Sequence, residues 1–466
     1  MKEKLYFSDN TILYFYKIKT FSKNSKFILL NIDSSILIEM EASQGALIEA
    51  LLSHSGESFI DVYEKFNNIW TKEQFTNLLN QLSQSLLLKT EENDKIINRH
   101  KKAKPDGINT IRLVIAQKCN LACKYCYGDS GGYNNKGLMS METAKKAIDF
   151  LFENAGDQRK LEIIFFGGEP LMNFQVVKDT VFYANKLAQE RNKELKLSIT
   201  TNGLMISDEI SEFLIKNKFY VTLSIDGNKD VHDSNRIFPC GPGSYDETVQ
   251  SIGKIRGKCN VIARGTVTRN GLNIIESFKH LESIGFDRIG LHTCVEMLDD
   301  NDYDILAKEY RKLVEIFSNL IENKEYNKAA KITNIVLLLR RIHNRSIKSN
   351  TCRAATSSLT IDKDGNIYPC HRFINEKDFN LGNIYKEFNL TKFNHIKNEI
   401  QVEHNKICDK CWAINYCGGG CRGQNFAMMN SISKPYYNNC KIQRAIIEEL
   451  ICLYSTLTEE DLTNIL

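Results

Sequence analysis

The sequence predicts an α/β protein built around a partial (β/α)6 barrel over residues 108–320. Within these bounds, six apolar strand-like runs alternate with segments of helical periodicity, which is the pattern of a parallel sheet covered by helices. Because eight such units close a full barrel, six predict an open one, with ligands bound at the carboxyl ends of its strands. A small domain over residues 1–100 and a cysteine-rich domain over residues 345–466 are expected on either side.

The elements of the predicted barrel alternate in chain order. Strands are expected at 111–116, 161–166, 195–200, 221–225, 261–268 and 289–291. Helices are expected at 140–154, 174–191, 207–217, 245–256 and 272–284, and residues 301–348 also read as helical. Each strand of the series is thus separated from the next by enough chain for the crossover that parallel pairing requires.

Length and composition narrow the class of protein. A chain of 466 residues should divide into two to four domains. Its net charge of +4 comes from 61 basic and 57 acidic residues, a balance that gives no reason to expect nucleic acid or an anionic membrane as a partner. The chain has no secretory signal pattern and no stretch near the ~20 apolar residues of a membrane span, so a soluble, unprocessed cytoplasmic protein is expected.

The first 100 residues predict a winged-helix-like module. Residues 5–40 alternate apolar and polar in short runs, as in a small antiparallel sheet, and the period lengthens to helical spacing from Ala42 onward. The expected helices lack the concentrated Lys and Arg that phosphate contacts need, so a peptide added to the sheet edge suits the module better than DNA. A stabilising domain without a ligand is the alternative. The polar segment 91–106, with a proline near its end, predicts a linker.

A cysteine motif follows the first barrel strand. Cys119, Cys123 and Cys126 have the spacing C-x3-C-x2-C, which can hold a [4Fe-4S] cluster while leaving one iron without a protein ligand. Such an open iron suits binding of a substrate-like molecule. The alternatives are a zinc site, which would need a fourth ligand, and chance clustering in a chain with 14 cysteines.

Polar and glycine-rich motifs recur at the ends of successive predicted strands. They are Gly167, Gly168 and Glu169 after the second strand, Ser198, Thr200 and Asn202 at the third, Ser224 and Asp226 at the fourth, and Arg264 in the fifth. The glycines allow close backbone approach to a ligand, and Glu169 can accept hydrogen bonds from a cation. Each motif alone is typical of an ordinary turn, so it is their recurrence that indicates a ligand site.

The C-terminal region contains seven further cysteines in short spacings, at positions 352, 370, 408, 411, 417, 421 and 440. Residues 362–368 predict a hairpin turn that brings Cys352 and Cys370 together. A zinc ribbon would explain C-x2-C pairs, but three later cysteines at matched spacing favour iron–sulfur ligation. In a large chain rich in Lys and Glu, metal ligation in a reducing compartment explains these cysteines better than disulfides do.

The first motif, with Tyr125 before its last cysteine, resembles the signature of the radical S-adenosylmethionine (radical SAM) superfamily. The seven later cysteines resemble the SPASM domain of peptide-modifying radical enzymes. The resemblance implies three [4Fe-4S] clusters, held by Cys119, Cys123 and Cys126, by Cys408, Cys411, Cys417 and Cys440, and by Cys352, Cys370 and Cys421. The last set lacks an obvious fourth cysteine, for which Cys294 is a remote candidate.

The same resemblance implies the contacts of S-adenosylmethionine. These are Tyr125, Gly167, Gly168, Glu169, Ser198, Thr200, Asn202, Ser224, Asp226 and Arg264, with Glu169 at the amino group and Arg264 at the carboxylate. It identifies no other catalytic residue.

Within the superfamily, the chain is most similar to maturases that form thioethers in cysteine-rich peptides, the SCIFF-type sactipeptide and ranthipeptide synthases. This likeness implies cross-linking of a Cys sulfur to a carbon in a ribosomally made precursor peptide, whose leader the N-terminal module recognises. It also implies an electron donor such as flavodoxin or ferredoxin, and neither nucleic acid nor membrane as a partner.

Two other functions remain open. Anaerobic sulfatase-maturing enzymes, which form formylglycine, normally lack the N-terminal module and carry Asp after the cysteine corresponding to Cys370, where this chain has His371. A non-enzymatic metal-binding regulator would use the N-terminal module on DNA and would bind zinc.

Overall fold

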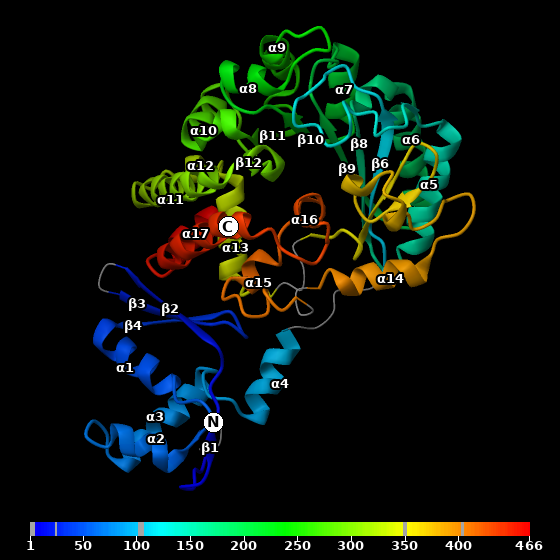
Figure 1. The fold of residues 1–466 in the computed structure, drawn as a ribbon. Helices are drawn as coiled ribbons and strands as arrows, with labels where there is room; N and C mark the ends of the chain where they lie inside the picture. The colour runs from blue at the N-terminus through cyan, green and yellow to red at the C-terminus, as the bar shows by residue number, and fades with distance from the viewer. Residues whose placement is uncertain (1–4, 24–25, 101–106, 348–351, 402–404) are drawn as a thin grey trace.

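The computed structural model describes residues 5–23, 26–100, 107–347, 352–401 and 405–466. Six parallel strands form its central sheet, and they neighbour one another in chain order: β6 (Thr110–Gln117), β8 (Lys160–Gly167), β9 (Glu194–Thr201), β10 (Tyr220–Ser224), β11 (Asn260–Val267) and β12 (Ile289–Thr293). In Figure 1 they run as an arc from β6 round to β12, with helices along its outer side. The predicted partial (β/α)6 barrel is therefore confirmed.

The outer helices lie close to the predicted positions. They are α5 (Met141–Asn154), α6 (Phe174–Glu190), α7 (Asp208–Lys216), α9 (Tyr245–Ile255) and α10 (Ile274–Ser283). Alternate residues of the strands, such as Ile163 and Phe165 of β8, are buried against these helices in one apolar core. The residues between them, such as Ile164 and Phe166, consequently face the inside of the arc. A further short helix, α8 (Lys229–Asn235), precedes α9 and was not predicted.

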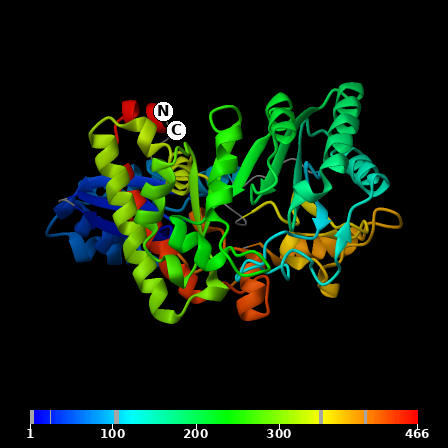
Figure 2. The same cartoon turned by 90° about the horizontal axis from the view of Figure 1, so that it is seen from above.

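The C-terminal region extends the barrel sheet. Strand β13 (Ser358–Ile361) pairs in parallel with β6, and β14 (Ile367–Tyr368) pairs antiparallel with β13, so the predicted hairpin is present. Among the described residues, five α-helices follow: α14 (Leu390–Glu399), α15 (Ile414–Cys417), α16 (Arg422–Met429), α17 (Tyr437–Tyr454) and α18 (Glu459–Ile465). The helix α17 packs along α11 (Asp300–Glu322) and α13 (Thr333–His343), and Figures 1 and 2 show α17 and α11 side by side.

The N-terminal residues form a separate antiparallel sheet followed by helices, in the predicted order. The strands are β2 (Ile18–Lys23), β3 (Lys26–Asn31) and β4 (Ile36–Glu41), and the helices are α1 (Ala42–Leu52), α2 (Phe59–Phe66) and α3 (Lys72–Gln84). Two residues before this sheet, β1 (Ile12–Leu13), pair with β5 (Glu57–Ser58). Side chains on one face of the sheet pack with these helices, while Phe21, Ile28 and Leu30 join the core of the remaining chain.

Part of the predicted linker is a helix. Residues Glu91–His100 form α4, which the side chain of Asn93 ties to the preceding turn by donating to the carbonyls of Ser83 (2.8 Å) and Leu88 (2.9 Å). The Tyr16 hydroxyl also donates to Asp94 at 2.6 Å. The prediction was wrong for this part because the polar composition hid these anchoring contacts. The rest of the predicted linker, residues 101–106, lies outside the described residues. Throughout the described ranges, no helix combines the length and the apolar character needed to cross a membrane.

Candidate functional site

The cysteine loop leaves β6 at the carboxyl end of the barrel. Two backbone hydrogen bonds hold it to the end of α8: Ala122 donates to the Ile237 carbonyl at 2.8 Å, and Lys124 donates to the Asn235 carbonyl at 2.9 Å. The thiols of Cys119, Cys123 and Cys126 lie close enough to influence one another electrostatically, so the structure brings the three predicted ligands together. Burial raises the pKa of Cys119 to about 12, so deprotonation there requires a nearby positive charge such as iron.

Gly167 and Gly168 let the end of β8 touch this loop. A Cβ atom on Gly168 would lie 2.4 Å from the Lys118 carbonyl oxygen, and one on Gly167, whose φ is +142°, would lie 2.2 Å from that of Ala116. No side chain fits in either position. The two glycines therefore serve close packing of backbone on the cysteine loop as well as any approach to a ligand.

The side chain of Glu169 is fully buried, and its hydrogen bonds are made with other groups of the protein. Its carboxylate accepts hydrogen bonds from the Thr201 hydroxyl (2.8 Å), the Leu171 amide (3.0 Å) and the Asn202 amide (2.8 Å). Burial raises the pKa of Glu169 to about 7, against these three hydrogen bonds. This geometry differs from the predicted contact with a cofactor amino group: the carboxylate joins the ends of β8 and β9, leaving only backbone groups of the motif for a ligand.

The residues expected from β9 lie at different depths. Asn202 is close to the cysteine loop. Its side-chain amide donates to Asn120 Oδ1 at 2.7 Å and lies 3.9 Å from the Cys119 sulfur. Thr200 is half-buried and lies on the inner face of the sheet, two residues before Asn202. Ser198 lies deeper still, where its hydroxyl donates to Glu162 Oε1 at 3.1 Å. Asn202 and Thr200 are therefore near the carboxyl end of β9, and Ser198 is not.

A buried ion pair supports the cysteine loop from β10. Asp226 accepts from Arg236 Nη2 at 3.1 Å, from the Thr266 amide at 2.8 Å and from the Tyr125 hydroxyl at 2.7 Å. The guanidinium of Arg236 lies 5.3 Å from the Tyr125 ring centroid and lowers the pKa of Cys123, against the larger opposing effect of burial. Asp226 thus holds Tyr125 of the loop and Arg236 beside one another. No signal in the sequence marked Arg236, because an isolated arginine after a charged helix has no recognisable spacing.

Arg264 lies on the inner face of β11, paired in register with Ser224 of β10. The residue is exposed to solvent, but the surrounding protein lowers the pKa of its guanidinium by desolvation. Arg112, Arg236 and Tyr127 are among its electrostatic neighbours. No described carboxylate forms an ion pair with it. An accessible, unpaired guanidinium at this position can bind a carboxylate.

The later cysteines lie in two parts of the C-terminal region. Cys352 and Cys421 are electrostatic neighbours of Cys370, and burial raises the pKa of Cys370 to about 11. The other group lines one small cavity and consists of Cys408, Cys411, Cys417 and Cys440. Among the described residues, no three His, Cys, Asp or Glu side chains lie close enough to hold a single metal ion.

Cys294 lies near the segment that carries Cys421, because the Gln424 side chain donates to the Thr293 carbonyl at 2.7 Å. Its thiol donates to Glu296 Oε2 at 3.5 Å, and no cysteine is among the main groups that shift its pKa.

Two rings bring the first cysteine loop and the Cys370 segment together. Tyr127 follows Cys126 directly, His371 follows Cys370 directly, and their ring centroids are 5.6 Å apart. His371 also contacts Phe166 of β8 at 4.6 Å. Burial lowers the pKa of His371 well below its usual value, and nearby arginines lower it further. The inside of the barrel between the two cysteine groups is therefore lined by rings and guanidinium groups.

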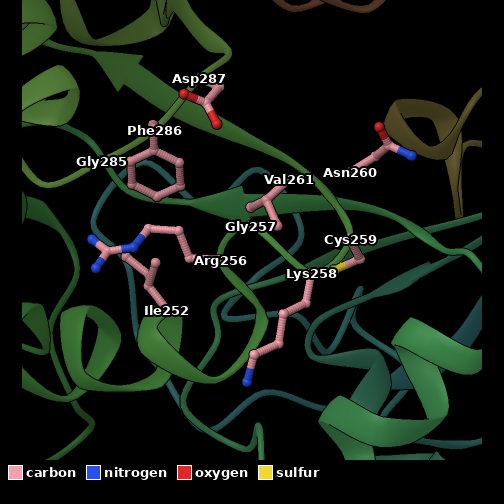
Figure 3. Close-up of a pocket in the computed structure, with 10 residues that line it drawn as sticks. All are labelled: Ile252, Arg256, Gly257, Lys258, Cys259, Asn260, Val261, Gly285, Phe286 and Asp287. Atoms are coloured by element: carbon pink, nitrogen blue, oxygen red, sulfur yellow. The ribbon is translucent and has the colours of Figure 1, made fainter.

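A separate hollow of about 370 Å³ lies at the opposite end of the sheet (Figure 3). It is lined by residues around the start of β11, including Arg256, Lys258 and Cys259. None of the predicted site residues lines it.

Comparisons with known proteins agree with this architecture. Residues 113–284 match the radical SAM superfamily, and residues 352–412 match an iron–sulfur cluster-binding domain, SPASM. A cysteine-type anaerobic sulfatase-maturating enzyme of Clostridium perfringens is 26% identical over 65% of this chain and 86% of its own. The radical SAM cyclopropyl synthase TigE of Paramaledivibacter caminithermalis is also 26% identical, over 84% of this chain and 85% of its own.

The fold is also that of a solved structure. Native anSMEcpe with bound AdoMet (S-adenosylmethionine) superposes with a TM-score of 0.64 and 22% identity, covering 75% of this chain and all of that one. The chain therefore contains a radical SAM domain, folded as a partial (β/α)6 barrel, followed by a SPASM iron–sulfur domain.

Proposed function

We propose that this enzyme installs a thioether cross-link between a cysteine sulfur and a carbon atom of a ribosomally made, cysteine-rich precursor peptide. The observation that carries the proposal is the contact of Tyr127 with His371, which joins the Cys119–Cys126 loop to the Cys370 segment across the inside of the barrel. A peptide entering there lies between a cysteine group suited to start radical chemistry and a second one close by.

Three [4Fe-4S] clusters and S-adenosylmethionine fit the residues present. Nine of these ten cysteines are partly or fully buried, while Cys352 is exposed, and the set of Cys408, Cys411, Cys417 and Cys440 lines its own cavity. The set of Cys119, Cys123 and Cys126 supplies three thiolates, which leaves one iron for the cofactor. When bound there, the cluster and S-adenosylmethionine supply the one-electron chemistry that removes a hydrogen atom from a substrate carbon.

The protein's own residues hold these groups in place. Asp226 fixes Tyr125 and Arg236 against the cysteine loop, and Glu169 joins two strand ends behind it. Arg264 is our candidate for the cofactor carboxylate, because the residue is exposed at the inner face of the sheet and its guanidinium has no described carboxylate partner. The backbone of Gly167 and Gly168, with Thr200, Asn202 and Ser224, completes the proposed cofactor site. Ser198 contributes indirectly, through its bond to Glu162.

The proposed domains are residues 1–100 for leader recognition, 108–320 for the radical SAM barrel and 345–466 for SPASM. The N-terminal sheet docks on the SPASM region, where Phe21 packs edge-on against Trp412 at 5.2 Å and the Asn415 amide donates to Ser35 at 2.9 Å. A leader peptide added to an edge of this sheet is thereby held beside the clusters. In a related solved structure, anSMEcpe has a Cp18Cys peptide bound; by analogy we propose a peptide substrate here.

Formylglycine formation is the second candidate, because sulfatase-maturating enzymes are among the relatives. Two observations favour thioether formation. The anSMEcpe structure is covered completely, yet a quarter of this chain has no counterpart in it. In addition, the resemblance to sulfatase-maturing enzymes implies an Asp where this chain has His371, whose ring contacts Phe166 inside the barrel. A zinc-dependent regulator is disfavoured because the chain carries the complete enzyme architecture.

The two reactions leave different products. The reconstituted enzyme is incubated anaerobically with S-adenosylmethionine, a flavodoxin or ferredoxin as cytoplasmic electron donor, and a cysteine-rich precursor peptide. A thioether lowers the peptide mass by that of a hydrogen molecule and blocks a cysteine from alkylation, whereas formylglycine is an aldehyde that reacts with a hydrazide. Formylglycine made from cysteine also removes a thiol, so loss of alkylation alone does not separate the two products. A peptide that reacts with the hydrazide would reject thioether formation. The variant with Cys119, Cys123 and Cys126 all changed to Ala serves as the control.

A further inference from the structure

Two buried polar atoms without partners lie side by side on the inner face of the barrel sheet. Thr360 of β13 is in register with Arg112 of β6, and residues paired in this way project to the same side of a sheet. Arg112 Nε and Thr360 Oγ1 are both buried, and neither has a hydrogen-bond partner among the described residues. Because a buried donor left unpaired costs free energy, the pair indicates that a ligand or water completes it.

Positive charge inside the barrel is only partly balanced. Arg236 pairs with Asp226, and Arg372 pairs with Glu296. By contrast, no carboxylate of the described residues forms an ion pair with Arg112 or with Arg264. If Arg264 binds the carboxylate of S-adenosylmethionine, Arg112 remains available for a second anion.

Arg112 lies where a substrate is expected. Its guanidinium is 5.3 Å from the ring centroid of Phe166, which also contacts His371. Arg112 is also an electrostatic neighbour of Tyr127 and of Cys370, which belong to the two segments that meet inside the barrel. An anion bound by Arg112 thus lies between the two cysteine groups.

We infer that Arg112 and Thr360 bind a carboxylate of the peptide substrate and so select where along the peptide the enzyme acts. The two oxygens of a carboxylate can accept from the guanidinium and from the hydroxyl together, which satisfies both unpaired atoms. The inference rests on the proposed peptide substrate and adds a recognition element to it. The carboxylate belongs either to an Asp or Glu side chain or to the C-terminus of the peptide.

Two simpler roles for Arg112 lead to different outcomes. Arg112 could serve only to offset the charge of the thiolates around Cys370, or an ordered water could satisfy both unpaired atoms. In the first case, changing Arg112 alters the cluster and leaves peptide preference unchanged. In the second, the enzyme does not distinguish a carboxylate from an amide.

The test uses fluorescent heptapeptides that contain one cysteine and differ at one other position, with the reconstituted holoenzyme and S-adenosylmethionine. One series has an amidated C-terminus and carries Asp, Asn, Glu or Gln at each distance from the cysteine. A second series carries Asn with a free C-terminal carboxylate. Fluorescence anisotropy measures the dissociation constants. We expect at least one acidic peptide to bind about 10-fold or more tightly than its amide counterpart, because charge-assisted hydrogen bonds to buried donors are strong.

Substitutions identify the residues that cause the preference for an acidic peptide over its amide counterpart. In Arg112→Gln the preference for the acid over the amide should vanish, in Arg112→Lys part of it should remain, and Thr360→Val should weaken it. Arg159→Gln, at an exposed arginine on the outside of the barrel, is the matched control and should keep the full preference. Iron content and the electron paramagnetic resonance spectrum of each variant report whether the clusters are intact.

Equal binding of acid and amide peptides to the wild-type enzyme, at every position and terminus, overturns the inference while leaving the peptide function standing. A preference that persists in Arg112→Gln overturns the assignment to Arg112. Binding of neither kind of peptide contradicts the peptide function and the inference together.

Discussion

The Tyr125 hydroxyl donates a hydrogen bond of 2.7 Å to Asp226, and this bond ties the cysteine loop to the end of β10. Asp226 is itself buried and paired with Arg236. A carboxylate in this position both orients a residue of the loop and neutralises the arginine beside Cys123. The cysteine loop therefore depends on β10 as well as on β6, the strand from which it leaves.

Replacing Asp226 with Asn should destabilise the protein by about 3–5 kcal/mol, because it leaves Arg236 buried without a counter-charge. Denaturant unfolding of the purified chain measures this change, and iron content after reconstitution should fall as the loop loses its support.

Two further variants provide a scale for the loss of stability in Asp226→Asn. Tyr125→Phe removes only one hydrogen bond and should cost about 1–2 kcal/mol. Asp208→Asn changes an exposed carboxylate paired with Lys254 and should shift stability by less than about 1 kcal/mol. An Asp226→Asn protein as stable as the Asp208→Asn protein would show that the buried pair does not support the loop.

The buried carboxyl group of Glu169 should make stability depend on pH. Burial raises its pKa from 4.5 to about 7 in the folded state, so the folded protein holds this proton more tightly than the unfolded chain does. The contribution is fully present below about pH 4.5 and is lost as pH rises through about 7, with a span of about 3 kcal/mol. Denaturant unfolding between pH 5 and 8, compared with Glu169→Gln, measures the contribution as the difference between the two slopes. Identical slopes would contradict it.

The barrel and its strand ends could be predicted because local patterns determine them. Strands such as β8 and β9 alternate with helices in a regular apolar pattern, and parallel pairing then brings Gly168 and Asn202 to the same edge. Short cysteine spacings likewise predicted which sulfurs lie together, since Cys119 and Cys126 belong to one loop.

Contacts between residues distant in sequence could not be predicted in the same way. The pairing of β13 with β6 joins segments more than 200 residues apart, and no local pattern marks the neighbours Arg112 and Thr360. Glu169 was expected to face a ligand, yet its burial depends on hydrogen bonds from β9 that the motif does not encode. The chemical types of the site residues were therefore predictable from the sequence, whereas the orientations of their side chains depended on tertiary packing.

The N-terminal sheet should stabilise the SPASM region directly. Phe21 is buried and its ring packs edge-on against Trp412, which lies beside Cys411. Phe21→Ala should cost about 3–5 kcal/mol through the cavity it leaves, and it should lower iron occupancy at the set of four cysteines that includes Cys411. Phe182→Ala, at a side chain 77% exposed, is the control and should have little effect on either quantity. Normal stability and iron content in Phe21→Ala would show that the two regions fold independently.

The ligands of the cluster proposed at Cys352, Cys370 and Cys421 can be tested through its iron content. The thiol of Cys294 is engaged with Glu296 and has no cysteine among the main groups that influence its pKa, whereas Cys370 is influenced by both Cys352 and Cys421. We therefore expect this cluster to have three cysteine ligands and one iron open to an external ligand. The intact enzyme should contain about twelve irons, from three clusters of four.

Cys294→Ala should accordingly keep the full iron content, while Cys370→Ala should lose about four irons. The open iron is tested in the variant that has Ala at Cys119, Cys123 and Cys126, so that the cofactor-binding cluster does not contribute. There, a cysteine-containing peptide should change the electron paramagnetic resonance spectrum, and the same peptide with Ser in place of Cys should not. Loss of iron from Cys294→Ala, or an unchanged spectrum with both peptides, would refute the open position, because the fourth ligand would then come from the protein.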